Sequence, residues 1–157
     1  MASRFVYVTY IRATPESIWD ALRKPEFTRR YFFGATQESD WKVGSAWKMF
    51  AANGNPTDSG EVLEYDPPRR FVLKWRNEFV PELKAEGYTR CAFDLVPQNG
   101  VTKLTVTHEI DMDNSKTIAG VSGGWPKILA GLKTLLETGK PMDSDQAASK
   151  RAAEAAN

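Results

Sequence analysis

Hydrophobic and polar side chains alternate with a period of two near the start of the chain. In residues 4–11, one set consists of Phe5, Tyr7, Thr9 and Ile11, and the other of Val6, Val8 and Tyr10. This period is typical of a β strand, whose successive side chains point to opposite faces of a sheet. The pattern therefore predicts a first strand over residues 4–11.

The same period returns through the middle of the chain, in segments separated by short turn sequences. Extended segments are expected around residues 45–51, 60–65, 71–76, 88–95 and 104–110, with a polar connection over residues 81–86. Among the turns, Gln98-Asn99-Gly100 contains the Asn-Gly pair that favours a tight hairpin. Because the connections are short, neighbouring strands are expected to pair in an antiparallel meander.

Two short helices are predicted between the first strand and the rest of the sheet. Thr14 has the residue type of an N-cap, and Pro15 suits the first helical position. An apolar stripe follows over residues 18–22, and Lys24-Pro25 interrupts it. A second short helix is expected over residues 27–33.

A longer amphipathic helix is predicted near the C-terminus, from Trp125 with Pro126 in its first turn to a stop at Gly139. Residues 120–124 are expected to form a glycine-rich approach outside this helix. Gly131 borders the apolar stripe and leaves two interpretations open: a large residue from the sheet packs against bare backbone, or space is left for a ligand. The stripe consists of Trp125, Ile128, Leu129, Leu132, Leu135 and Leu136.

Composition limits the classes of protein to which the chain can belong. Its 157 residues are 41% hydrophobic and 26% charged, as in a globular domain. The formal net charge of +1 gives no electrostatic basis for binding nucleic acid. Charged and polar residues interrupt every apolar run before a membrane-spanning length, so no membrane insertion is expected. The single cysteine excludes an internal disulfide and, together with the lack of a signal-like apolar segment, favours a cytoplasmic location.

We expect one α+β domain over residues 1–142, followed by a polar, alanine-rich tail over residues 143–157. An antiparallel sheet with one apolar face must have that face covered. The C-terminal helix is the one predicted element long enough to cover it. The expected architecture is a curved antiparallel sheet around a long C-terminal helix, with two short helices after the first strand.

Five separated segments occur in an order that is specific as a set. They are TPESIWDALRKPEFTRRYFFG at residues 14–34, WKVGS at 41–45, GEVLEYDPPRRFVLKW at 60–75, THEI at 107–110 and GGWPKILAGLKTLLETG at 123–139. Together they resemble the Hsp90-ATPase-activator-homologue branch of the START/Bet v 1-like (SRPBCC) superfamily. The resemblance implies a helix-grip fold. It also implies an apolar cavity between sheet and helix, which in the superfamily takes lipids, sterols, polyketides or other aromatic molecules.

Candidate ligand-binding residues have large or polar side chains on the predicted inner faces. His108 leaves two interpretations open: a structural histidine bonded to backbone or to a tyrosine hydroxyl, or a hydrogen-bonding group for a ligand hydroxyl or carbonyl. Cys91 is interpreted as a small buried hydrophobe, and no metal site or cofactor is expected. No motif of a catalytic centre is present. The full set is Tyr7, Trp19, Phe27, Tyr31, Phe71, Trp75, Cys91, Phe93, Val106, His108, Trp125, Ile128, Leu129 and Leu132.

Three functions remain open from the sequence. The first is non-catalytic binding of a hydrophobic small molecule, such as a lipid, a polyketide or a flavonoid-like aromatic compound, in an internal cavity. The second is an enzyme of the aromatase/cyclase kind, in which a polar pocket residue would shuttle protons. The third is a protein-interaction or co-chaperone module that uses its outer surface, for which Arg29-Arg30 beside Tyr31 is one candidate contact.

Overall fold

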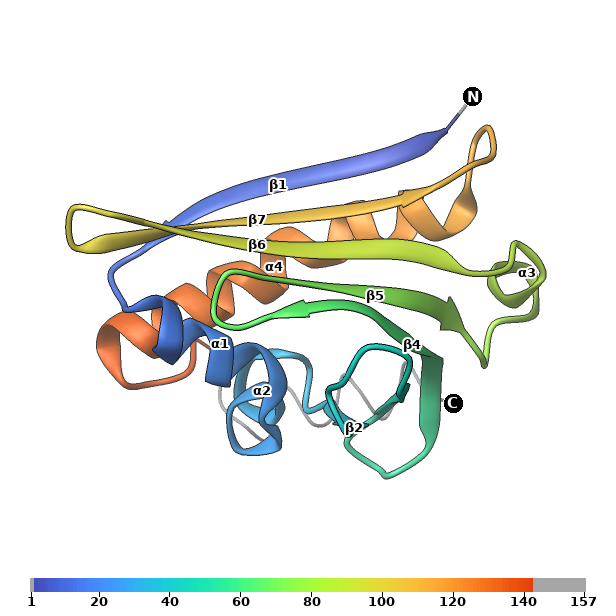
Figure 1. Cartoon of the computed structure of the whole chain (residues 1–157). Coiled ribbons are helices and arrows are strands. Elements are labelled where there is room, and N and C mark those ends of the chain that lie inside the picture. Colours follow the sequence, from blue (N-terminus) through green and yellow to red (C-terminus); the bar gives the residue numbers. More distant parts are fainter. Residues whose placement is uncertain (1, 143–157) are drawn as a thin grey trace.

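The computed structural model describes residues 2–142, which form one antiparallel sheet, one long helix and three short ones (Figure 1). The sheet has 7 strands in the order β1-β7-β6-β5-β4-β3-β2. The elements are β1 (Ser3–Ile11), α1 (Pro15–Arg23), α2 (Pro25–Tyr31), β2 (Thr36–Ser39), β3 (Ala46–Phe50), β4 (Pro56–Asp66), β5 (Arg70–Asn77), α3 (Pro81–Ala85), β6 (Thr89–Gln98), β7 (Val101–Ile110) and α4 (Lys116–Thr138).

Strands β3 to β7 follow one another in the sheet as they do in the sequence, which confirms the predicted meander. The hairpin between β6 and β7 turns at Asn99 and Gly100, whose φ angles of 46° and 86° are those that an Asn-Gly turn adopts. Strand β1 closes the order by pairing antiparallel with β7, so that Phe5 lies opposite His108. The first and last strands of the chain are therefore neighbours.

Each of the two short helices begins with a proline, and a side-chain cap precedes the first of them. The Thr14 side chain accepts a hydrogen bond from the Ser17 backbone N–H at 3.1 Å, and Pro15 opens α1. Helix α2 begins with Pro25, two residues before the predicted start. The proline that was expected only to interrupt the first helix also begins the second, because its fixed φ suits a first helical turn.

Helix α4 begins at Lys116 and not at Trp125, so the prediction for residues 120–124 was wrong. The Ser115 side chain accepts a hydrogen bond from the Ile118 backbone N–H at 3.1 Å and caps the helix. Pro126 consequently lies inside the helix. The missing proline N–H removes one intrahelical hydrogen bond, which packing of the surrounding side chains must offset. The helix ends at Gly139, whose φ of 80° is left-handed, as predicted.

Two further elements were not predicted from the sequence. Strand β2 pairs with β3 at the edge of the sheet, and Gln37 joins the two by accepting a hydrogen bond from the Trp47 indole at 2.9 Å. Helix α3 occupies part of the segment expected to be a polar connection. Both elements are short, and short elements give little periodicity to detect.

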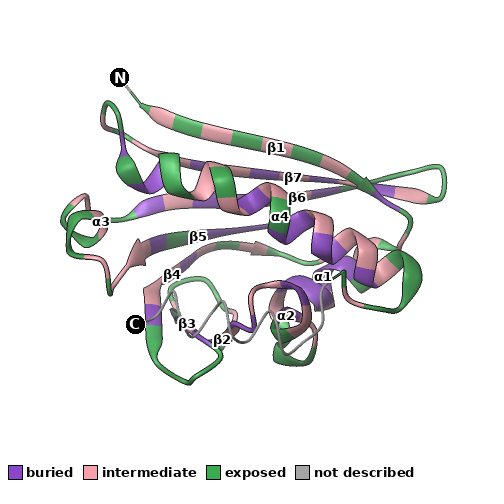
Figure 2. Ribbon diagram, turned by 180° about the vertical axis from the view of Figure 1, so that it is seen from behind, coloured by how far each residue is buried: buried purple, intermediate pink, exposed green. Residues whose placement is uncertain are grey.

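Helix α4 crosses the concave face of the sheet, as Figure 2 shows from behind. Its C-terminal half carries buried Leu129, Leu132 and Leu135, which join one hydrophobic core with inward-facing residues of the strands. This arrangement is the helix-grip fold, and it confirms the predicted α+β architecture. None of the helices within residues 2–142 has the length and apolar character needed to cross a membrane. The predicted tail, residues 143–157, lies outside the described residues.

Candidate functional site: a pocket beside the first half of α4

A pocket of about 380 Å³ opens between the first half of α4 and the end of the sheet formed by β3, β4 and β5. Helix α3 and the segment that follows α2 complete its walls. Most of its lining side chains are apolar, and several are aromatic. The lining residues are Phe32, Phe33, Ala35, Met49, Ala51, Thr57, Asp58, Trp75, Asn77, Phe79, Leu83, His108, Thr117, Gly120, Val121, Gly124, Trp125 and Ile128.

Small residues of α4 leave the space that the pocket occupies. Thr117, Gly120, Val121 and Gly124 all line the pocket, and their spacing of three or four residues places them on one helical face. A Cβ atom built on Gly120 would meet no atom within 4 Å, and one on Gly124 would meet only Ile128, at 4.0 Å. The pocket is therefore bounded on this side by nearly bare helix backbone.

Aromatic rings from β5, from α4 itself and from the segment that follows α2 form much of the remaining lining. The Trp75 and Trp125 rings lie 5.8 Å apart with an interplanar angle of 82°. The ring centroid of Phe32 is 5.7 Å from that of Trp125. Behind Trp75, toward the core, lies Trp47 at 4.5 Å. Edge-to-face packing of this kind holds the rings in fixed orientations.

A chain of hydrogen bonds fixes His108 in the wall. The Trp125 indole N–H donates to His108 Nδ1 at 3.1 Å. The Thr89 hydroxyl donates to the Trp75 carbonyl at 2.9 Å, so its oxygen accepts from His108 Nε2–H at 2.7 Å. Burial lowers the pKa of His108 from 6.5 to about 4, and the imidazole is neutral near pH 7. Both nitrogens thus have partners within the protein, as the structural interpretation of His108 requires.

Asp58 is the charged residue of the pocket. Its Oδ2 accepts a hydrogen bond from the Trp75 indole N–H at 2.7 Å. Burial raises the pKa of the Asp58 carboxyl above its ordinary value, and the negative charge of Glu78 adds to this effect, while the hydrogen bond from Trp75 opposes it. A carboxylate in a largely apolar pocket is energetically costly unless a partner stabilises its charge.

The structure brings Trp75, His108, Trp125 and Ile128 together at the pocket. The remaining candidates from the sequence lie away from its lining. Tyr7 and Phe27 are half-buried at the margin of the core. The others belong to the packed core itself, and they are Trp19, Tyr31, Phe71, Cys91, Phe93, Val106, Leu129 and Leu132.

Gly131 allows helices α4 and α2 to pack closely together. A Cβ atom at Gly131 would lie 3.3 Å from Tyr31 Cβ and 3.4 Å from the Tyr31 carbonyl oxygen. The neighbour is therefore helix α2, not a side chain from the sheet. The Tyr31 hydroxyl donates to the Ala21 carbonyl at 2.6 Å and is turned into the protein. Burial raises the pKa of the Cys91 thiol well above its ordinary value, so this cysteine stays protonated.

Sequence reasoning missed Asp58 and the small-residue face of α4. Asp58 lies between the segments expected to be extended, residues 45–51 and 60–65, so no inward face was predicted for it. The face of α4 could have been found by treating Ser115 as an N-cap and extending the helical spacing backward from Trp125. Pro126 hid this signal, because proline at that position also fits a helix start.

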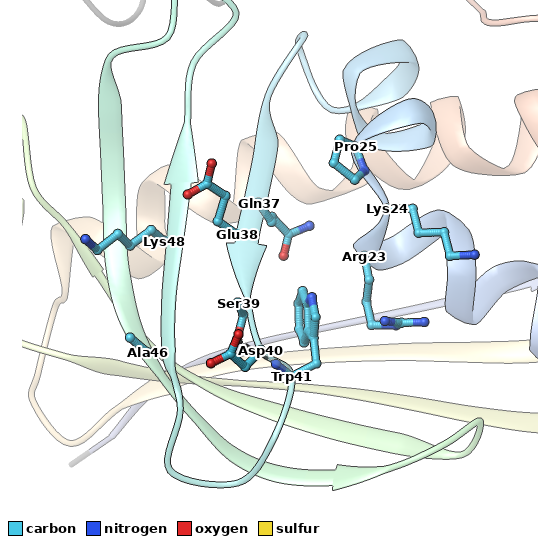
Figure 3. Close-up of a pocket in the computed structure, with 10 residues that line it drawn as sticks. All are labelled: Arg23, Lys24, Pro25, Gln37, Glu38, Ser39, Asp40, Trp41, Ala46 and Lys48. Carbon is cyan, nitrogen blue, oxygen red and sulfur yellow. Dashed lines mark hydrogen bonds between the residues drawn. The ribbon is translucent and has the colours of Figure 1, made fainter.

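A second, more polar groove of about 630 Å³ lies outside the sheet edge, between β2 and the junction of α1 with α2 (Figure 3). Arg23 and Trp41 lie beside each other there, with the guanidinium carbon 5.6 Å from the ring centroid. The same guanidinium also lies over the rings of Trp19 and Tyr65. Lys24, Glu38, Asp40 and Lys48 surround the groove with charges of both signs.

The described residues include no group of three or more His, Cys, Asp or Glu side chains that could hold a metal ion. The single histidine of the chain is already bonded on both sides, and Cys91 is buried without a second thiol. The pocket is thus a largely apolar space with a single carboxylate.

Solved structures with the same fold include a protein from a biosynthetic locus and an Hsp90 activator. DynU16, a protein of the dynemicin biosynthetic locus, has a TM-score of 0.73 and 20% identity over 90% of this chain and 50% of its own. CalU16 from Micromonospora echinospora has a TM-score of 0.69 and 20% identity over 98% of this chain and 85% of its own. PFC0360w, an Hsp90 activator from Plasmodium falciparum, has a TM-score of 0.69 and 21% identity over 85% of this chain and 96% of its own.

The chain spans half the length of DynU16, and at these identities the likeness concerns the fold alone. Among curated proteins, no sequence matches the chain. The family model described as activator of Hsp90 ATPase homolog 1-like protein matches residues 12–137. The matched segment runs from the end of β1 through nearly all of α4, and it includes every residue that lines the pocket.

Proposed function

The chain belongs to the family of activator of Hsp90 ATPase homolog 1-like proteins, and from this premise we propose that it binds a hydrophobic small molecule in the pocket beside the first half of α4. The observation that carries the proposal is the contrast within one helix. Its second half fills the core with leucines, whereas its first half presents Gly120 and Gly124 to open space lined by aromatic rings. We propose that binding is non-catalytic and takes place in the cytoplasm.

The driving force would be the removal of apolar surface from water. Burying about 200 Å² of ligand surface contributes about 5 kcal/mol at about 25 cal/mol per Å². The volume of about 380 Å³ favours a compact aromatic molecule or a short polyketide over a long lipid chain. The rings of Trp75 and Trp125 line the pocket where they can contact an aromatic ligand, and both nitrogens of His108 are already bonded within the protein.

A thermal-shift screen tests this proposal. Flavonoids, short polyketide mimics and small fatty acids are each added at increasing concentration, and a compound that binds the folded state raises the melting temperature. Gly124→Leu places a side chain in the pocket, whereas Gly123→Leu makes the same change at an exposed residue of α4 outside the lining. We expect shifts in the wild type and in Gly123→Leu that Gly124→Leu loses. Equal shifts in both variants would contradict the location, and no shift with any class would contradict the function.

A protein partner is the second candidate, because the family takes its name from Hsp90 ATPase activators and the Plasmodium falciparum neighbour is one. The candidate contact is Arg29 and Arg30 at the end of α2. Pull-down with purified Hsp90, comparing the wild type with Arg29→Glu/Arg30→Glu, tests it. Binding that the charge reversal abolishes would support this function, and absence of binding would contradict it.

A further inference from the structure

The described residues that line the pocket include one acidic side chain and no lysine or arginine. Among the described residues that line it, Asp58 alone has a formally charged side chain near pH 7, since His108 is neutral. The nearest other carboxylate to influence it is Glu78, which is also negative. Glu78 itself is paired with Arg76 and Lys84. Asp58 therefore gives one wall of a largely apolar pocket an ionisable carboxyl group, whose negative form a cation beside it would favour.

Asp58 has no cationic partner within the part of the chain that the structure describes. Glu64, for comparison, pairs with both Arg70 and Arg90, at 3.2 Å and 2.9 Å. The hydrogen bonds to Asp58 come from neutral groups, the Thr57 side chain and the Trp75 indole, which stabilise the carboxylate without cancelling its charge. A buried carboxylate of this kind is stabilised most effectively by an opposite charge placed beside it.

The rings around Asp58 suit the same kind of ligand. The faces of tryptophan and phenylalanine rings attract cations through their quadrupoles. Trp75 donates its indole N–H to Asp58 and its ring lines the pocket, so the carboxylate lies at the edge of an aromatic ring of the wall. Phe79 and Trp125 also line the pocket. A cation that reaches Asp58 would thus be surrounded by aromatic groups as well.

The described residues of the pocket offer an anionic ligand no positively charged group to bind. The N-terminus of α4, which would attract an anion, is already occupied by Glu86. The Glu86 carboxylate accepts hydrogen bonds from the Ser115 hydroxyl at 2.7 Å and from the backbone N–H groups of Lys116 and Thr117 at 2.7 Å and 3.1 Å. No lysine or arginine lines the pocket among residues 2–142.

We propose that the ligand of this pocket is a hydrophobic amine, whose ammonium group lies against the Asp58 carboxylate and whose aromatic body lies among Trp75, Phe79 and Trp125. This inference rests on the proposed function, because it specifies the class of molecule that the same pocket takes. Trp75 then has two roles: its indole N–H orients the carboxylate, and its ring contacts the ligand.

Three probes with one aromatic body separate charge from hydrophobicity. Tryptamine is a cation, tryptophol has a neutral hydroxyl and indole-3-acetate is an anion, and all three have the same indole ring. Isothermal titration near pH 7 is expected to give tryptamine at least about 10-fold tighter binding than tryptophol, with indole-3-acetate the weakest. Asp58→Asn keeps an oxygen that can accept the Trp75 indole N–H, so it is expected to fold and to reduce the preference for tryptamine to less than about 2-fold.

Asp111→Asn is the matched control, because it makes the same change of net charge at an exposed residue outside the pocket. It is expected to retain the preference for the amine. If tryptophol binds the wild type as tightly as tryptamine does, the inference is overturned while the proposed function stands. If none of the three probes binds, the inference is overturned, and the thermal-shift screen with its other compound classes decides the proposed function separately. If Asp58→Asn retains the full preference, the cation lies elsewhere and the inference is overturned.

Discussion

The interior between the sheet and the helices contains aromatic residues at both ends, but it is filled at one end and open at the other. At one end the Phe71 and Phe93 rings stack at 4.4 Å, and Trp19 meets Phe71 edge-to-face at 5.1 Å. At the other end Trp75 and Trp125 also pack edge-to-face, yet they border a pocket. An abundance of aromatic residues therefore does not by itself decide whether an interior is filled.

The difference lies in what covers each end. Helices α1 and α2 cover the filled end, and α2 approaches α4 so closely that Tyr31 contacts the backbone at Gly131. The open end is bordered by the short helix α3, by the segment that follows α2 and by the first half of α4. Because that half presents glycine at Gly120 and Gly124, no side chain fills the space. A helix can thus cover a core with one half and border a pocket with the other.

The largest expected effect is the difference in stability loss between a substitution in the filled core and one at the exposed edge of the pocket. Phe71 is 1% exposed and Phe79 is 38% exposed. We expect Phe71→Ala to lower the free energy of unfolding by about 3–5 kcal/mol, because it leaves a cavity among packed rings. Phe79→Ala is expected to cost less than about 1 kcal/mol. Urea unfolding of both variants measures this, and similar losses would mean that the two ends do not differ in packing.

The second prediction concerns acid stability. The folded-state pKa of His108 is about 4, below the ordinary 6.5 that applies to the unfolded chain. Between these values the unfolded state binds more protons, so stability falls as the pH is lowered from about 6.5 toward 4, by about 3 kcal/mol from this residue. The chain has one histidine, so its imidazole signal in an NMR titration is unambiguous. A titration midpoint near 6.5 would contradict the buried hydrogen-bonded state.

A smaller effect is expected from the hydrogen bond that links α4 to the sheet. Trp125→Phe removes the indole N–H that donates to His108 Nδ1 and leaves that nitrogen buried without a donor. We expect a loss of about 1–3 kcal/mol in the free energy of unfolding. Trp41→Phe is the control, because Trp41 is half-buried and its ring packs against Tyr65, Phe71 and the Arg23 guanidinium. Equal losses would show that ring volume, not the hydrogen bond, decides the effect.

The smallest effect compares two glycines of one helix. Gly120→Ala gains helix propensity with no contact to offset it, so it is expected to raise the free energy of unfolding by about 0.5–1 kcal/mol. Gly131→Ala would place its Cβ 3.3 Å from Tyr31 Cβ, so we expect a smaller gain or a loss. Thermal unfolding of the two variants makes the comparison. A larger gain at Gly131 than at Gly120 would reverse the assignment of filled and open halves.

The fold was largely predictable because it depends on periodicity and turn chemistry. The alternation in residues 4–11, the Asn99-Gly100 turn and the cap at Thr14 each act locally, and each is found as expected. The start of α4 was missed because Pro126 satisfies two rules at once. Proline fits a first helical turn, and it is also tolerated inside a helix whose neighbours stabilise it.

The site was less predictable because it depends on the space that the surrounding elements leave unfilled as well as on the residues that line it. Trp75, His108, Trp125 and Ile128 were identified as inward-facing, but nothing local distinguishes them from Phe71 or Leu132, which are packed. What distinguishes them is the lack of a covering helix on one side, which is a tertiary property. Asp58 was missed because its inward direction depends on strand β4, whose pairing with β3 and β5 contains register shifts.

The most direct test of the open pocket is an NMR titration of the ¹⁵N-labelled protein with tryptamine, observing the indole N–H signals of the tryptophans. The signals of Trp75 and Trp125 are expected to shift together along one binding curve, while that of Trp19 in the filled end stays in place. Shifts confined to Trp41 would place the ligand in the polar groove beside β2, and would contradict the assignment of the binding site to the pocket beside α4.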